Sequence, residues 1–288
     1  MGSKNLKWFL LITLALIWGS SFILIKKGLV GLNPFQLGSL RIIFCAVFLL
    51  IIGFKSVTKI PQFQWKYIGL TALFGTFLPV YLFSVAQTQI SSSVSSILNS
   101  LTPLNTLLIS VLFFGLGFKR IQFFGVVVGL IGTSVLILNG NTHGENHNNY
   151  YAFLVIIASI CYAINVNLIK KYLSNLTPLS ITTGNFLIML IPAITVLLCT
   201  DFTEIVYHQE TQHAMLFIMV LAVVGTGIAN ILFFKLVQMS SPVFASSVTY
   251  LIPVVAFFWG MVDNEMLTGI QFLGAFIILI GVYLANKK

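Results

Sequence analysis

Residues 24–34 of this chain read LIKKGLVGLNP, and residues 168–178 read LIKKYLSNLTP. The two segments match at a displacement of 144 positions, and further matches follow in unbroken order at displacements of 150 and 149. Gly75-Thr76, Phe83 and Pro103 return as Gly225-Thr226, Phe233 and Pro253, and Gln122-Phe123 returns as Gln271-Phe272. Small insertions and deletions in loops account for the drift in displacement, so the chain consists of two copies of one unit.

The composition of the chain indicates a membrane protein. Of its 288 residues, 58% are hydrophobic and 7% are charged, and the mean hydropathy is +1.02. A soluble chain of this size would have too few polar side chains to cover its surface. Uncharged apolar stretches of about 18 to 25 residues can cross the hydrocarbon as helices. The sequence therefore predicts an all-α integral membrane protein.

Ten membrane-crossing helices are predicted, five in each copy. The ranges are 8–25, 34–53, 66–87, 91–115, 121–138, 151–169, 178–199, 214–237, 242–262 and 267–286. With an odd number in each copy, the second copy enters the membrane from the opposite side. Such an inverted-topology repeat is common among secondary transporters. Residues 1–140 are then the first repeat, residues 141–150 a linker, and residues 151–288 the second repeat.

The distribution of charge supports this count and gives an orientation. If the N-terminus is cytoplasmic, most of the 15 Lys and Arg residues fall in cytoplasmic segments. Lys26, Lys27 and all six acidic residues fall on the other side, and Arg41 is left within a span. Basic residues are enriched in cytoplasmic loops, so both termini are predicted to be cytoplasmic. The net charge of +9 follows from this topology and predicts no nucleic-acid partner.

The predicted spans lack the side chains that catalysis requires. Every Asp, Glu and His falls in a loop or at the end of a predicted span, whereas a hydrolase needs titratable groups or an activated nucleophile at the reacting centre. No Gly-rich phosphate loop is present either. We expect no enzymatic activity, no cofactor and no metal site. Because proton relays in carriers commonly use such groups at depth, we also expect movement down the gradient of the solute.

Polar and aromatic residues at depth are the candidates for a binding site. Such residues normally face the interior of a helix bundle or a water-filled cavity. Trp18 and Ser21 lie one turn apart in the first span, and their counterparts at a displacement of 144 are Tyr162 and Asn165. The predicted substrate-binding residues are Trp18, Ser21, Arg41, Tyr81, Asn99, Tyr162, Asn165, Asn230 and Tyr250.

Several of these assignments have alternatives that the sequence leaves open. Serine and asparagine also join helices to each other in membrane bundles. Arg41 either binds an anionic group of the substrate or extends to the helix end. Pro103 and Pro253 bend their helices at matching depths and serve either gating or packing. Gly125 and Gly281 permit close helix approach, which marks the fifth and tenth spans as a scaffold.

These features together resemble the EamA-like family of the drug/metabolite transporter superfamily. The resemblance covers essentially the whole chain. It rests on two copies of five spans, on Ala15-Leu16-Ile17-Trp18-Gly19 followed by Ser21-Phe22, on an arginine in the second span, on the Ser-rich starts and prolines of the fourth and ninth spans, and on Asn264-Glu265 before Gln271 and Gly274. One departure is Leu116, where the family usually has the glutamate that Glu265 keeps in the second half.

The resemblance implies a multi-pass carrier in the bacterial cytoplasmic (inner) membrane with a cavity between its halves. We expect it to export an amino acid or a related metabolite by alternating access. A carrier for a nucleotide sugar or a sugar phosphate is an alternative, as is a membrane scaffold subunit that transports nothing. The expected partners are a small-molecule substrate and the lipid bilayer, and a homodimer is left open.

Overall fold

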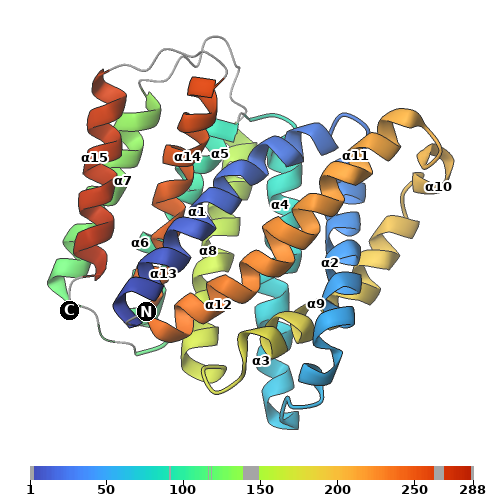
Figure 1. Ribbon diagram of the computed structural model, residues 1–288, viewed down its shortest axis with the longest axis horizontal. Coiled ribbons are helices and arrows are strands. Elements are labelled where there is room, and N and C mark those ends of the chain that lie inside the picture. The colour runs from blue at the N-terminus through green and yellow to red at the C-terminus, as the bar shows by residue number, and fades with distance from the viewer. Residues whose placement is uncertain are drawn as a thin grey trace.

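The computed structural model describes residues 3–90, 92–115, 117, 119–138, 149–262 and 269–286, and these residues form helices and short connections without a strand (Figure 1). The α-helices are α1 (Ser3–Gly28), α2 (Pro34–Val57), α3 (Trp65–Ala72), α4 (Leu78–Ala86), α5 (Ser92–Asn99), α6 (Thr102–Leu112), α7 (Arg120–Leu138), α8 (Asn149–Tyr172), α9 (Pro178–Leu198), α10 (Phe202–Ile205), α11 (Gln209–Val220), α12 (Ala229–Met239), α13 (Pro242–Ser246), α14 (Val248–Val262) and α15 (Gly269–Asn286). A 3₁₀ turn, η1 (Gln62–Gln64), and two π-helical segments, η2 (Leu73–Phe77) and η3 (Leu221–Ile228), complete the chain order.

The prediction of an all-helical membrane protein is confirmed, whereas the number of crossings stays a prediction. Six described helices are long and apolar enough to cross a membrane: Asn5–Gly28, Pro34–Val57, Gln62–Ala86, Tyr150–Tyr172, Pro178–Leu198 and Gln209–Met239. Four shorter apolar helices fall in the other predicted ranges: Thr102–Leu112, Arg120–Val135, Pro242–Val255 and Leu273–Ala285. Leu116, Asn264, Glu265 and residues 141–148 of the predicted linker lie outside the described residues.

The second helix of each half begins in the same way. The Asn33 side chain accepts hydrogen bonds from the backbone N–H groups of Phe35 and Gln36, and the Gln36 side chain accepts one from the Asn33 N–H. In α9 the Thr177 hydroxyl oxygen accepts from the Ser180 N–H at 3.1 Å. A proline follows each cap, at a position where its missing N–H has no helical partner.

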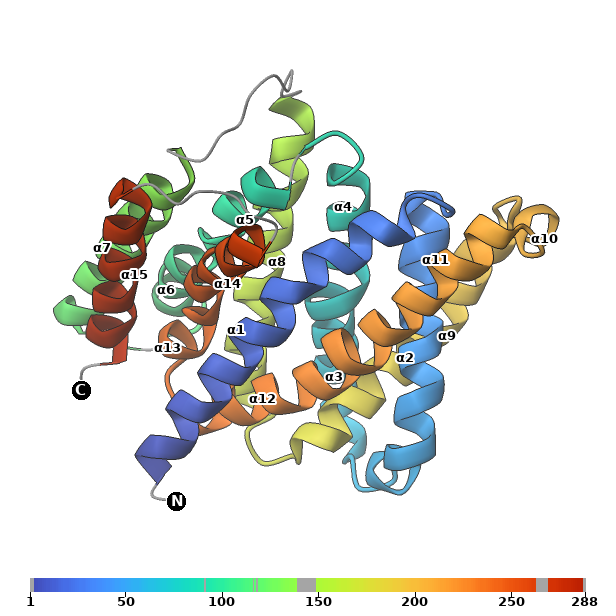
Figure 2. The ribbon, with the colours of Figure 1, turned by 45° about the horizontal axis from the view of Figure 1, so that its top comes forward.

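Helices from the two halves are interleaved. The views in Figures 1 and 2 show α7 beside α15, and α2 beside α9. The second predicted span of one repeat therefore packs on the second span of the other, and the fifth span packs on the fifth. The first helix, α1, lies against α11, η3, α12 and α14 of the second half, whereas α8 lies against α3, η2, α4, α5 and α6 of the first half. We call these two assemblies the α1 group and the α8 group.

The two groups contact each other extensively at one end. This lower end in Figure 1 holds the start of α1, the end of α8 and the end of α12. Leu11 and Leu14 of α1, Ile169 of α8 and Phe244 of α13 belong to one buried apolar cluster there. Van der Waals packing of these side chains joins the two groups at this end.

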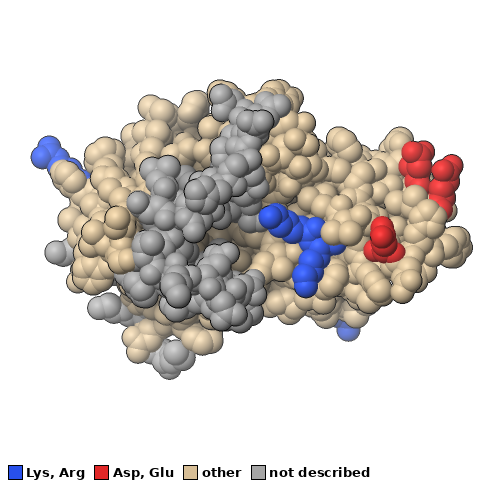
Figure 3. Space-filling view, turned by 90° about the horizontal axis from the view of Figure 1, so that it is seen from above, with Lys and Arg blue, Asp and Glu red and all other residues tan. Residues whose placement is uncertain are grey.

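The opposite, upper end carries the charged side chains that the sequence assigns to the outer face. Figure 3 looks onto it: basic side chains lie beside a recess near the middle, and acidic side chains gather at one edge. The last turn of α1 contributes Lys26 and Lys27. Asp201, Glu204 and Glu210 are exposed near α10 and α11. The recess therefore opens on the face that carries these charged side chains.

Candidate functional site

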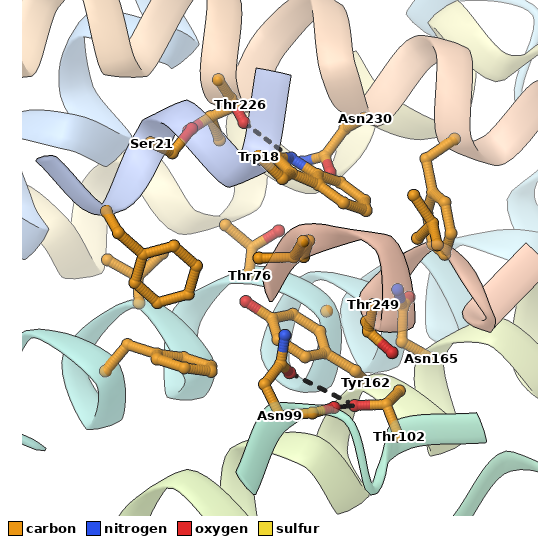
Figure 4. Close-up of a pocket in the computed structure, with 18 of the residues that line it drawn as sticks. Trp18, Ser21, Thr76, Asn99, Thr102, Tyr162, Asn165, Thr226, Asn230 and Thr249 are labelled. Carbon is orange, nitrogen blue, oxygen red and sulfur yellow. Dashed lines mark hydrogen bonds between the residues drawn. The ribbon is translucent and has the colours of Figure 1, made fainter. Parts of the chain in front are cut away.

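A cavity of about 910 Å³, including its opening to solvent, lies between the α1 group and the α8 group. Its lining extends from the middle of the helices to Ile25, near the upper end of α1, and Gln87, which follows α4. Polar side chains from both halves take part, and the labelled ones surround one common space in Figure 4: Trp18, Ser21, Thr76, Asn99, Thr102, Tyr162, Asn165, Thr226, Asn230 and Thr249.

Two π-helical segments shape the middle of this cavity. They are centred on Gly75-Thr76 and on Gly225-Thr226, which correspond at the displacement of 150. A π segment inserts an extra residue into a helix and is frequent at functional sites. Each interrupts a long membrane helix at the same depth of its repeat, so the two helices widen where the cavity lies.

The glycines of these segments make matching contacts with the other half. A Cβ atom on Gly75 would lie 2.5 Å from the Asn165 amide, and a Cβ atom on Gly225 would lie 2.9 Å from the Ser21 Oγ. Ser21 and Asn165 correspond at the displacement of 144. Each glycine therefore gives the polar residue of the opposite half room to reach the cavity.

The aromatic contacts repeat in the same manner. The ring of Trp18 packs edge-on against Phe233, with centroids 5.1 Å apart, and the ring of Tyr162 lies against Phe83 at 6.0 Å. Trp18 corresponds to Tyr162, and Phe83 to Phe233. In addition, the Trp18 indole N–H donates to the Gly225 carbonyl at 3.0 Å. Two aromatic walls, one from each group, therefore face the cavity.

The prolines interrupt hydrogen bonding next to the cavity without lining it. Pro103 is the second residue of α6, directly after the break between α5 and α6, and Pro253 lies inside α14. Proline leaves the carbonyl four residues earlier without its helical partner. These carbonyls belong to Asn99 and Thr249, and they accept instead from the hydroxyls of Thr102 at 2.6 Å and Ser100 at 3.4 Å. The prolines thus fix irregular backbone at two cavity residues.

Arg41 brings a positive charge to the cavity. Its Nε donates to the Thr226 hydroxyl at 2.8 Å, so the side chain extends from α2 toward η3. No ion pair joins it to a carboxylate in the described part of the chain, and no described Asp, Glu or His lines the cavity. Arg41 is half-buried, and a charge partly withdrawn from water is stabilised by a partner, which favours an anionic group of a bound solute beside the guanidinium.

Several other polar atoms of the lining are buried without a partner among the described residues. They are the Thr76 hydroxyl, both amide atoms of Gln87 and the Asn165 Oδ1. These three residues are 2%, 6% and 2% exposed. Unsatisfied buried polar groups are rare. These atoms are themselves enclosed, so the hydrogen-bonding capacity of three lining residues is unused in this arrangement of the helices.

Seven of the nine predicted binding residues line this cavity: Trp18, Ser21, Arg41, Asn99, Tyr162, Asn165 and Asn230. Tyr250 lies off the cavity, because its side chain is fully buried and its hydroxyl donates to the Val126 carbonyl at 2.8 Å. Tyr81 also lies off the cavity, because its hydroxyl shares a 2.8 Å hydrogen bond with Ser39. Both tyrosines join helices to each other.

The cavity also contains residues that the sequence argument did not select. Thr76, Thr226, Phe83 and Phe233 all belong to the matching segments of the repeat. Their recurrence was the signal that could have identified them. Gln87 gave no such signal, since its counterpart in the second half is Val237.

Comparison with known proteins identifies a matching family and two relatives that are named as transporters or efflux pumps. The sequence model of the EamA-like transporter family matches residues 6–138 and again residues 149–287. A protein of Escherichia coli strain K12 named uncharacterized inner membrane transporter YedA is 27% identical over 96% of this chain and 89% of its own length. A probable amino-acid metabolite efflux pump of the same organism is 27% identical over 96% of this chain and 93% of its own.

A solved structure shares the fold. It is described only as a crystal structure of a protein, and it superimposes with a TM-score of 0.74 over 96% of this chain and 95% of its own. Its sequence identity of 18% shows likeness of architecture alone. The same arrangement of helices therefore occurs in a chain of very different sequence.

Proposed function

The chain belongs to the EamA-like transporter family, and from this we propose that it exports an amino acid or a related small metabolite across the bacterial inner membrane by alternating access. It is a membrane transporter with several spanning helices. The finer proposal includes ten crossings in two inverted repeats and movement down the gradient of the solute. A name that refers to amino-acid metabolites, carried by a relative at 27% identity, supports the substrate class.

The single observation that carries the proposal is a cavity lined by equivalent residues of both halves. Secondary transporters place substrate at the interface between their repeats, near mid-membrane. The mirrored contacts of Gly75 with Asn165 and of Gly225 with Ser21 support a pseudo-two-fold axis through this space. A scaffold subunit would have no use for a cavity lined by equivalent polar residues of both halves.

The chemistry of the lining favours a solute with one carboxylate. Arg41 supplies the positive charge, and arginine suits carboxylate geometry because it can donate two parallel hydrogen bonds. Carbonyl oxygens of Gln87, Asn99 and Asn165 can accept from an amino group, and the faces of Trp18 and Tyr162 suit an apolar side chain. One arginine is a weak match for the several charges of a sugar phosphate or nucleotide sugar.

Efflux from vesicles that contain the purified protein tests this function. We expect single amino acids or related carboxylates to leave protein-containing vesicles faster than empty ones, and sugar phosphates to remain. In N165A the rate should fall roughly five- to tenfold, because one buried hydrogen bond contributes about 1 kcal/mol. N5A alters an exposed amide at the start of α1 and should leave the rate unchanged. Equal rates in protein-containing and empty vesicles, for every amino acid and carboxylate tried, would refute transport.

The proposed orientation has its own test, at two equivalent loop positions. Val30 follows α1 and Ser174 follows α8, and both are exposed. In a background with Cys45, Cys161 and Cys199 replaced, V30C should react with a membrane-impermeant maleimide in intact cells. S174C should react only after the cells are opened. The reverse pattern would invert the topology, and labelling of both in intact cells would contradict the inverted repeat.

A further inference from the structure

The two ends of the cavity differ in a way that the repeat makes visible. At the lower end, α8 packs against α12 and α13 across the boundary between the two groups. The equivalent pairs at the upper end are α1 with α4 and α1 with α5, and among the described residues they make no comparable contact. The structure is therefore closed at the lower end and open toward the upper end.

Two polar side chains cross the boundary at the closed end. The Lys170 Nζ, on α8, donates to the carbonyls of Val237 and Gln238 at 3.3 and 3.0 Å, at the end of α12. In return, the Gln238 Nε2 donates to the carbonyls of Leu173 and Leu176 at 3.3 and 2.8 Å, just beyond α8. The interaction is reciprocal, and it satisfies carbonyls at both helix ends. It must break if α8 and α12 separate.

The equivalent residues at the open end are present but apart. Lys170 corresponds to Lys26, and the acceptors Val237 and Gln238 correspond to Gln87 and Thr88, directly after α4. Lys26 is exposed and donates no hydrogen bond to any described residue. Gln87 lines the cavity with both amide atoms unpartnered. The upper end thus has the lysine and the two equivalent backbone carbonyls, whereas Thr88 stands where Gln238 supplies the amide donor.

The second lysine of each pair, Lys27 or Lys171, makes its contacts within its own group and serves as a control for the first. Lys171 donates to the Phe114 carbonyl at 2.8 Å and lies over the ring of Phe114, which follows α6 in its own α8 group. Lys27 lies 5.0 Å over the ring of Phe217, on α11 of its own α1 group. Neither contact crosses the boundary. In each Lys-Lys pair the second lysine therefore contacts its own group, and Lys170 is the first lysine that contacts the opposite group in this structure.

We propose that Lys170 and Gln238 form an inner latch that holds this outward-open state, and that Lys26 forms the equivalent outer latch by donating to the carbonyls of Gln87 and Thr88 when the cavity opens inward. The proposal rests on the alternating access of the proposed function. It gives a role to Lys26 at the predicted outer end of α1, where basic residues are disfavoured. The transporter then exchanges one charge-assisted latch for its counterpart in each half-cycle.

Spin-label distance measurements in lipid nanodiscs test the latches without any transport assay. One label pair, V30C with Q89C, spans the upper end, and its equivalent, S174C with M239C, spans the lower end. In the protein with both lysines intact, the label pair at the lower end should be close together and the label pair at the upper end far apart. In K170M, the population with a long lower and a short upper distance should rise about tenfold, because the latched state loses hydrogen bonds from a charged group. K170R keeps the donor and should match the parent protein.

The outer latch is tested in the K170M variant, in which the inward-open population is raised. K26M added to K170M should lower the inward-open population about tenfold, back toward the parent value, whereas K27M and K171M should leave it unchanged. If K170M yields too little folded protein, Q238L removes the reciprocal donor and should shift the distances the same way. Unchanged distances in K170M and Q238L would overturn the inner latch, and an unchanged population on adding K26M would overturn the outer one. A shift without any measurable efflux would keep the latch and refute the transport proposal instead.

Discussion

Substitution of Arg41 by methionine is expected to reduce efflux of a carboxylate substrate by about a hundredfold or more. Arg41 is the described cation that lines the cavity, and no described carboxylate pairs with it. Removing one partner of a buried charge pair costs about 2–5 kcal/mol, much of it from the charge left unpaired. Initial rates over a range of substrate concentrations, in vesicles with equal amounts of protein, measure this loss.

Two further substitutions separate charge from geometry at the same position. R41K keeps the positive charge but loses the planar group that matches a carboxylate, so it should recover only part of the rate. T226V keeps the arginine and removes the hydroxyl that accepts from its Nε, and should cost roughly fivefold, the value of about one hydrogen bond. If R41M transports carboxylates as well as the parent protein, Arg41 serves the packing of α2 and the anion lies elsewhere.

The helical class of the protein could be predicted because composition and period act over whole segments. Each of the ten predicted ranges overlaps at least one described helix. The interruptions were not predicted: η2 and η3 contain no proline, and their π geometry depends on neighbours in the other half. Likewise the sequence places a proline in the fourth range, but only the fold shows that Pro103 starts a new helix after a break.

The sequence predicted residues that line the cavity where depth in the helix and symmetry of the repeat agreed. Trp18 and Asn165 occupy equivalent turns of the helices that meet at the cavity. Tyr250 failed this test for a local reason, since it faces α7 and a Cβ atom on Gly129 would lie 2.7 Å from its ring. A missing side chain on a neighbouring helix can make room for a tyrosine. A single sequence does not show which helices are neighbours.

The repeat is more informative about mechanism than about any single residue. Under the proposed alternating access, equivalent contacts that are present in both halves, such as Trp18 with Phe233 and Tyr162 with Phe83, are expected to stay assembled in both states. Equivalent contacts that are present in only one half, such as that of Lys170, are expected to break. Differences between the halves of one chain therefore indicate which contacts form a rigid frame and which form gates. The proposed frame includes α7 and α15, which must pack closely.

Replacing Gly281 with valine is expected to remove most of the folded protein. A Cβ atom there would lie 2.6 Å from the Gly129 Cα and 2.8 Å from the Gly125 carbonyl oxygen. Because these contacts are with backbone rather than with a flexible side chain, α7 and α15 would have to move apart along the length of their interface. Overpacking typically costs about 1–3 kcal/mol and occasionally more, and the buried apolar cluster that contains Val126 of α7 and Ala285 of α15 depends on this pair staying close.

The measurement is the yield of monodisperse protein in detergent together with its apparent Tm, which should fall by roughly 10 °C for a loss of about 3 kcal/mol. Gly69, in α3, is the matched control, because a Cβ atom there would meet only Ile188 at an ordinary 4.0 Å. G69A should hold or raise the Tm, since alanine favours a helix interior over glycine by about 0.5–1 kcal/mol. Equal Tm values for G281V and the parent protein would show that α7 and α15 can separate without loss, and that they are not the frame against which the gates move.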